Sequence, residues 1–125
     1  MPDERLGKAE RLCSSSEFRE VLNKGRAYGG RRLVLFCLED AGGTTRVGFT
    51  TTRRVPNAVV RNRAKRLMRE AYRRVRHGLR ENGLRMVVLA RGDTRGLTYD
   101  NVRGELVDLF TRARVWSEGK GETEG

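Results

Sequence analysis

Side chains that proteins use for catalysis are scarce in this sequence of 125 residues. It has one histidine, His77, so a ribonuclease mechanism that needs two histidines is excluded. Its two cysteines, Cys13 and Cys37, are too few for a disulfide framework or a cysteine metal site. The acids lack the spacing of a metal-binding motif, and there is no glycine-rich phosphate loop. The sequence therefore indicates no catalytic residue, no metal ligand set and no cofactor motif.

Long apolar runs are also missing. No segment reaches the roughly 20 apolar residues that a membrane-spanning helix needs. The N-terminus carries Asp3, Glu4 and Glu10, which a signal peptide would not. We expect a soluble, cytoplasmic protein with no membrane partner, and the length suits one domain with a single modest core.

Acidic residues are also few relative to basic ones. The chain has 27 Lys and Arg against 16 Asp and Glu, which gives a net charge of +11 and a pI near 10.9. This balance points to nucleic acid as the main partner, with an anionic membrane surface as the weaker alternative. No feature predicts a dedicated protein partner.

Residues 57–77 dominate what the sequence does contain. Apolar side chains recur there at spacings of three and four, the period of one helix face. These apolar residues are Val60, Ala64, Leu67, Met68, Ala71 and Val75. The rest of the helix is basic, with Glu70 as the one acid between residues 61 and 76. A solvated helix usually pairs acids with bases at i, i+4, so we expect an external polyanion to neutralise this one.

The other elements follow from apolar patterns and capping signals. A short helix should begin after residues 14–16 and end at Gly25, with Phe18, Val21 and Leu22 on its apolar face. Strands are predicted over residues 26–32, 33–38, 46–54 and 85–91, and a last helix from the Thr98 cap through Ala113. The predicted fold is a single α/β (α+β) domain, ordered α-β-β-β-α-β-α over residues 1–116, with a disordered tail over residues 117–125.

Two connections can be predicted as well. Gly42 and Gly43 lie in a turn over residues 39–45, which predicts a hairpin between the strands on either side. Pro56 and Asn57 lead into the central helix, with Asn57 as its N-cap. A strand, a helix and a further strand then imply a crossover, so residues 85–91 should run parallel to a neighbour.

The stretch Arg61-Asn62-Arg63-Ala64-Lys65-Arg66, after a strand like residues 46–54, resembles the signature of the bacterial ribonuclease P protein component. The resemblance extends over about residues 5–115. It implies a four-stranded sheet with a left-handed βαβ crossover. It also implies an accessory subunit of an endoribonuclease that removes the 5′ leader of precursor tRNA. In that family the RNA subunit is the catalyst, and the holoenzyme requires Mg²⁺.

The resemblance also implies two groups of site residues. The residues matching the family's contact with the catalytic RNA are Arg61, Asn62, Arg63, Lys65, Arg66, Arg69 and Arg73. Those matching its contact with the precursor-tRNA leader are Phe18, Phe36, Thr50, Thr52, Arg53 and Arg54. Aromatic faces stack on unpaired bases with little sequence preference, which suits a leader of variable sequence. A place in the core is the alternative for the two phenylalanines. Pro56 and Leu22 depart from the family pattern.

Two other function classes stay open at this point. A non-enzymatic RNA-binding or ribosome-associated protein could use the same cationic helix without promoting leader removal. A self-sufficient protein nuclease is the third class, and the missing acid–base pair and metal cluster argue against it.

Overall fold

The computed structural model describes residues 15–39, 45–52, 57–79, 83–92 and 94–115. Its elements follow the predicted order. They are α1 (Ser15–Lys24), β1 (Arg26–Gly29), β2 (Leu33–Glu39), β3 (Arg46–Thr51), α2 (Ala58–Val75), β4 (Leu84–Ala90) and α3 (Tyr99–Arg112), with 3-10 turns η2 (Arg76–Gly78) and η3 (Thr94–Gly96). The predicted turn over 40–44, Pro56, Arg53, Arg54 and the tail lie outside the described residues.

The sheet has four strands in the order β1-β2-β4-β3. The predicted hairpin between β2 and β3 is therefore wrong, because β4 lies between them and pairs with β2 antiparallel and with β3 parallel. The antiparallel hairpin is instead β1–β2, closed where Gly30 N donates to Leu33 O at 2.7 Å. The expected βαβ crossover is present as β3-α2-β4. Its left-handed sense remains the implication of the resemblance.

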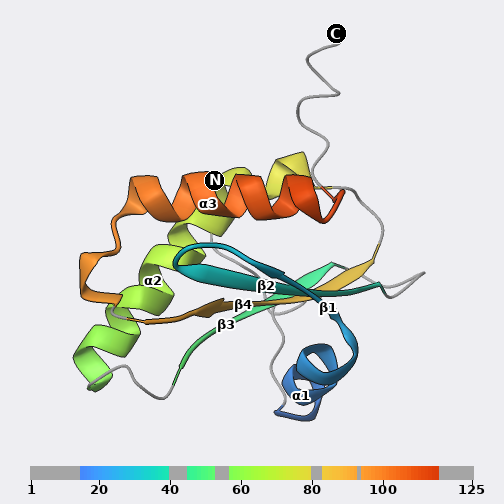
Figure 1. Ribbon diagram of the computed structural model, residues 1–125, viewed down its shortest axis with the longest axis horizontal. Coiled ribbons are helices and arrows are strands. Elements are labelled where there is room, and N and C mark those ends of the chain that lie inside the picture. The colour runs from blue at the N-terminus through green and yellow to red at the C-terminus, as the bar shows by residue number, and fades with distance from the viewer. Residues whose placement is uncertain (1–14, 40–44, 53–56, 80–82, 93, 116–125) are drawn as a thin grey trace, which may run out of the picture.

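Helices cover the two faces of the sheet unequally. Figure 1 shows α2 and α3 together on one face and α1 alone on the other. The main core lies under α2 and α3, where side chains from all four strands are packed against both helices. On α2 the apolar face is confirmed, since Ala64, Met68, Ala71 and Val75 are buried. Tyr72, which the apolar pattern did not include, is buried there too and meets Phe49 and Phe110 edge to face.

The N-caps of α2 and α3 are those expected from the sequence. The Asn57 side chain accepts from Val60 N at 3.0 Å at the start of α2. Thr98 and Asn101 form a reciprocal capping box at the start of α3. Each cap satisfies amide groups that have no partner inside the helix, which fixes where the helix begins.

The apolar face predicted for α1 is only partly confirmed. Val21 is fully buried, but Leu22 is 37% exposed. The reason is geometric. Among the described elements only the sheet packs against α1, so it covers a narrow stripe of the helix and Leu22 falls outside that stripe. Cys37, expected to be a buried free thiol, forms no disulfide and is half-buried at the edge of the main core.

Candidate RNA-binding surfaces

The first surface is the cationic face of α2, which we define by Arg61, Asn62, Lys65, Arg66 and Arg69. Arg61, Asn62, Arg66 and Arg69 are exposed, and Lys65 is half-buried. Within the part of the chain that the structure describes, none of its four cations forms an ion pair. The helix thus presents a row of like charges to solvent, a pattern that an approaching polyanion would stabilise.

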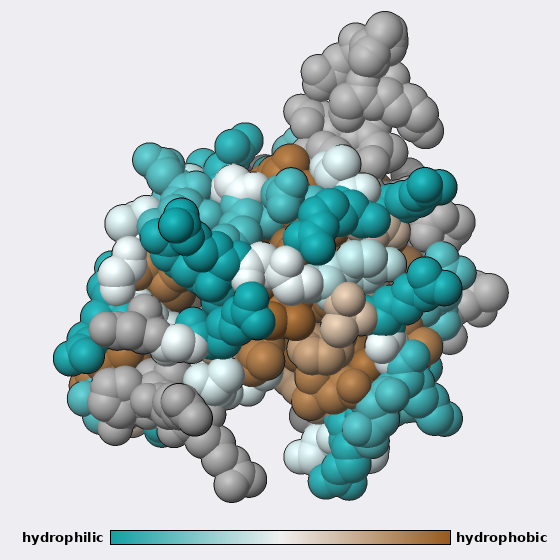
Figure 2. All heavy atoms as spheres, viewed as in Figure 1, coloured by the Kyte–Doolittle hydropathy of each residue, from teal (hydrophilic) through white to brown (hydrophobic). Residues whose placement is uncertain are grey.

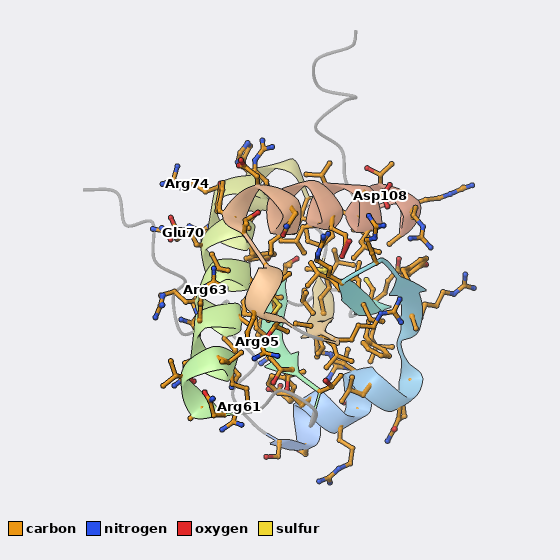
Figure 3. All side chains as sticks on the ribbon, turned by 60° about the vertical axis from the view of Figure 1, so that its left-hand side comes forward. Arg61, Arg63, Glu70, Arg74, Arg95 and Asp108 are labelled. Atoms are coloured by element: carbon orange, nitrogen blue, oxygen red, sulfur yellow. The ribbon has the colours of Figure 1, made fainter. Side chains whose placement is uncertain are left out.

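Two predicted contact residues on the same helix have partners inside the protein. Arg63 Nη2 donates to the carbonyl oxygen of Leu97 at 2.9 Å, which ties η3 to α2. Arg73 is paired with Glu70, which also meets Arg74 at 3.4 Å. Figure 3 shows Arg61, Arg63, Glu70 and Arg74 spaced along the length of α2, with Arg95 beside its first half. Arg63 therefore fixes a neighbouring loop, whereas the cationic face itself stays open.

The second surface is the face of the sheet that carries α1. Side chains alternate along β3, so Gly48, Thr50 and Thr52 share this face while Val47 and Phe49 face the main core. Phe18 of α1 and Phe36 of β2 meet here in a small apolar cluster with Val21, Val87 and Leu38. The structure thus brings together Phe18, Phe36, Thr50 and Thr52, four of the six residues predicted to contact the leader.

The α1 helix is held over this face by two ion pairs at one end of the strands. Glu17 meets Arg46 of β3 at 2.6 Å, and Glu20 meets Arg85 of β4 at 2.8 Å. The hydrogen bond and charge of Arg85, with a smaller contribution from Lys24, hold the pKa of Glu20 below its usual value. The carboxylate of Glu20 therefore stays ionised, and its pair intact, to a lower pH than a free glutamate would allow.

Among the described residues, α1 is the one helix on this face of the sheet. The row of paired residues next to that of Gly48 and Val87 on this face consists of Thr50, Leu89, Val34 and Gly29. Thr50 and Leu89 are half-buried. The Thr52 hydroxyl is buried without a hydrogen-bond partner among the described residues. Figure 2 shows apolar side chains gathered where α1 meets the sheet, with hydrophilic side chains around them. An apolar floor with an unsatisfied hydroxyl group at its margin suits a strand of unpaired nucleotides.

Gly48 sets the position of the Phe18 ring. A methyl group at residue 48 would lie 2.3 Å from the tip of that ring, so Gly48→Ala must displace it from the sheet. We expect the variant to lose about 1–3 kcal/mol of unfolding free energy, as overpacked sites do. We also expect it to bind precursor tRNA less tightly while its affinity for mature tRNA is unchanged, which paired titrations would measure.

The matched control is Gly104→Ala, since nothing lies within 4 Å of a methyl group at that exposed position of α3. The free energy of unfolding of this control should rise by up to about 1 kcal/mol, because alanine is a better helix former than glycine. If the ratio of the affinities for precursor and mature tRNA were the same for Gly48→Ala as for the unmodified protein, Phe18 would have no part in leader binding.

Neither surface brings catalytic groups together. Over the described ranges there is no cluster of three or more His, Cys, Asp or Glu residues that could hold a metal ion. His77 is exposed in η2, at the opposite end of α2 from Arg61. None of the helices in the described part of the chain has the length and apolarity of a membrane span.

Comparison with known proteins agrees with this geometry. The sequence model of the family Ribonuclease P matches residues 6–114. The ribonuclease P protein component of Gluconacetobacter diazotrophicus is 40% identical over 109 residues, covering 86% of this chain and 94% of the relative. That of Clostridium novyi is 34% identical, covering 90% of this chain and 100% of the relative.

Solved structures show the same fold. The Staphylococcus aureus RNase P protein superposes with a TM-score of 0.76 at 23% identity, covering 88% of this chain and 100% of the other. The Thermotoga maritima RNase P protein gives a TM-score of 0.71 at 25% identity, covering 82% and 96%. The family match spans the cationic helix, both surfaces and all four strands, so the chain belongs to the ribonuclease P protein component family.

Proposed function

We propose that this chain binds the catalytic RNA of ribonuclease P through α2 and the 5′ leader of precursor tRNA on the α1 side of the sheet. The observation that carries the proposal is the cationic face of α2, whose charges have no ion-pair partner within the described ranges. Family membership supports a role in tRNA processing, which we propose to be 5′-end maturation in the cytoplasm. In this proposal one surface binds the RNA subunit and the other binds the substrate.

Electrostatics supplies the affinity in this proposal. Each phosphate that an arginine or lysine neutralises releases counterions, so binding weakens steeply with salt. Arginine suits the task because its planar fork donates two hydrogen bonds to one phosphate. The leader surface contributes stacking on Phe18 and Phe36, worth about 1–3 kcal/mol per base, with little sequence preference. Arg53 and Arg54 are proposed to extend this surface, at positions outside the described residues.

The chemistry of cleavage belongs to the RNA subunit in this proposal, together with its Mg²⁺. The described part of the chain has no carboxylate cluster that suits a magnesium site, and four of its carboxylates are already engaged. Glu17, Glu20 and Glu70 are paired with arginines, and Glu105 is bonded to backbone amides. The protein's own contribution is to hold catalytic RNA and precursor tRNA together and to neutralise phosphate repulsion between them.

Reconstitution at low Mg²⁺ tests the function. The catalytic RNA should cleave precursor tRNA slowly on its own under these conditions, and adding the protein should increase the rate, because protein cations replace part of the Mg²⁺ atmosphere. Cleavage is followed by release of the labelled leader. The protein with precursor tRNA but without the RNA subunit is the control.

Three outcomes separate the function classes. Faster cleavage only with the RNA subunit supports the proposal. RNA binding with an unchanged rate would favour the non-enzymatic RNA-binding class. Specific cleavage by the protein alone would make it a nuclease in its own right.

A further inference from the structure

A hollow of about 780 Å³ lies between the end of α3 and the strands β1 and β2, and we call it the basic groove. Residues from the end of α1, the strands β1 and β2, and the end of α3 line it. They are Lys24, Arg26, Tyr28, Cys37, Leu38, Glu39, Arg112, Ala113, Arg114 and Val115. The α3 residues in the lining are at the C-terminal end of that helix, and Figure 1 shows this end of α3 across the molecule from the first turns of α2.

Strand alternation builds the floor. Arg26 and Tyr28 project from the same face of β1, and Cys37 is the register partner of Arg26 on β2. Tyr28 is half-buried and packs against the main core, which holds its ring in position. The last residues of α3 form the opposite wall. The groove therefore has an aromatic and apolar floor under a basic rim.

Among the described lining residues, positive charge exceeds negative charge. The cations are Lys24, Arg26, Arg112 and Arg114, and the acid is Glu39. Arg26 and Arg114 are exposed and form no ion pair over the ranges that the structure describes. Lys24 has only a 3.7 Å surface contact with Glu20, which is already bonded to Arg85.

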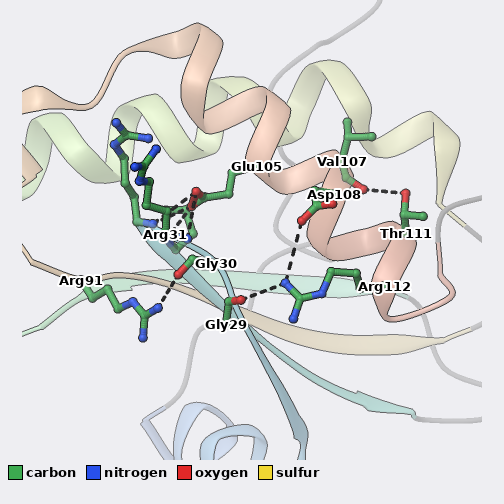
Figure 4. Close-up of polar contacts among 11 residues, drawn as sticks. Gly29, Gly30, Arg31, Arg91, Glu105, Val107, Asp108, Thr111 and Arg112 are labelled. Atoms are coloured by element: carbon green, nitrogen blue, oxygen red, sulfur yellow. Dashed lines mark hydrogen bonds and ion pairs between the residues drawn. The ribbon is translucent and has the colours of Figure 1, made fainter.

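Arg112 fixes the inner end of the groove. Its Nη1 donates to the carbonyl oxygen of Gly29 at 2.8 Å and lies 3.8 Å from Asp108, which joins the end of α3 to the edge strand β1 (Figure 4). The two walls are thereby held in place before any ligand arrives. A preformed groove costs little ordering on binding.

Arg114 is the unusual residue. Its φ is +65°, and it is the one non-glycine residue with positive φ in the described chain. It follows α3 at the position where Arg114 N donates to Thr111 O and Val115 N to Phe110 O, a helix ending that usually has glycine. An L-residue there is strained by about 1 kcal/mol. Its side chain is exposed and forms no ion pair with the described residues, so its charge is available at the rim of the groove.

We propose that the basic groove is a second RNA site, which takes a single-stranded segment with its phosphates on Arg26 and Arg114 and a base on Tyr28. The volume is in the range of pockets that hold small ligands, which includes one nucleotide. Aromatic floor and cationic rim are the two parts that sequence-tolerant single-strand binding uses. The proposal rests on the proposed function, because it adds a contact remote from α2 to the same ribonucleoprotein.

The test uses the full chain with Arg26→Ala and Arg114→Gly combined. Glycine at 114 removes the strain with the charge, so the variant should melt no lower than the unmodified protein. Two lost phosphate contacts on a single strand should reduce the slope of log K against log salt by about 1.4 and lower affinity by roughly tenfold at 100 mM salt. Titrations with catalytic RNA alone and with precursor tRNA alone identify which RNA supplies the strand.

The control is Arg31→Ala with Arg103→Ala, which removes two exposed arginines that are in neither the groove nor the cationic face. If the groove variant titrates like this control with both RNAs, the second site does not exist. Arg61→Ala with Arg66→Ala in the same series tests the proposed function separately, since only that variant alters α2. A loss with either RNA that exceeds the control supports the groove.

Discussion

Replacing Arg61 and Arg66 together by alanine is expected to weaken binding of the catalytic RNA more than any other surface change considered for this protein. Both side chains are exposed on α2 and form no ion pair with the described residues, so their removal costs the fold little. Each lost phosphate contact should reduce the salt slope by about 0.7–0.9, the coefficients for single strands and for duplex DNA. The ratio of the affinity at 50 mM salt to that at 200 mM salt should then be roughly tenfold smaller for the variant than for the unmodified protein. Filter binding or fluorescence anisotropy across that range measures it.

The control for this variant is again Arg31→Ala with Arg103→Ala, which makes the same change in net charge away from α2. It separates contact with phosphate from a general loss of positive potential. An Arg61/Arg66 variant with the control's salt slope would contradict the placement of the RNA subunit on α2. Arg63 is unsuitable for this test, because its bond to Leu97 makes any loss partly structural.

The local signals in the sequence were sufficient for the helices and strands. Asn57 and Thr98 bond the amides that the capping pattern assigns to them, and the three-and-four spacing on α2 marks the residues that are buried. Such signals act within a few residues, so tertiary context had little opportunity to override them. The same spacing missed Tyr72, since a tyrosine beside Arg73 does not stand out as apolar.

The order of the strands depended on longer-range pairing. Gly42 and Gly43 suggested a β2–β3 hairpin, but the composition of the strands carried the better information. Residues 33–38 and 86–90 are continuous apolar runs, as central strands buried on both faces require, whereas β3 alternates Val47 and Phe49 with glycine and threonine. The two apolar runs pair with each other and leave β1 and β3 at the edges.

Parts of the candidate site could also be predicted from the sequence, while other parts depend on the fold. The cationic face of α2 could be predicted because periodicity and charge lie in one continuous segment. The meeting of Phe18 with Gly48 could not, because it depends on how α1 crosses the sheet. The basic groove was equally hidden, since its rim residues come from α1, β1 and α3, and only the fold brings them together.

Glu105 is the residue whose loss should destabilise the fold most. In the sequence it is one of several acids on an exposed helix. In the structure its carboxylate accepts from the backbone amides of Arg32 at 2.8 Å and Leu33 at 2.7 Å, and from Arg31 at 3.2 Å (Figure 4). Gly30 leaves room for it, because a methyl group there would lie 3.0 Å from the carboxyl carbon. One side chain thus joins α3 to the β1–β2 hairpin.

We expect Glu105→Ala to lower the free energy of unfolding by about 3 kcal/mol, because charge-assisted hydrogen bonds are lost and the amide of buried Leu33 is left without a partner. For a domain of this size that corresponds to a fall in Tm of roughly 10–20 °C, measured by circular dichroism. The stability of Glu105→Gln should lie between that of Glu105→Ala and that of the unmodified protein. Its one amide oxygen can still accept hydrogen bonds from Arg32 and Leu33, but its NH₂ group faces another donor.

Asp108→Ala is the matched control, because it removes the same charge from the same helix. Asp108 has a 64% exposed side chain and a 3.8 Å contact with Arg112, so its loss should cost about 0–1 kcal/mol. Equal destabilisation by the two variants would mean that the rise in net positive charge, rather than the bonds to the hairpin, is responsible. A larger loss for Glu105→Ala, with Glu105→Gln between, would identify the carboxylate bonds to the hairpin as the link between α3 and the sheet.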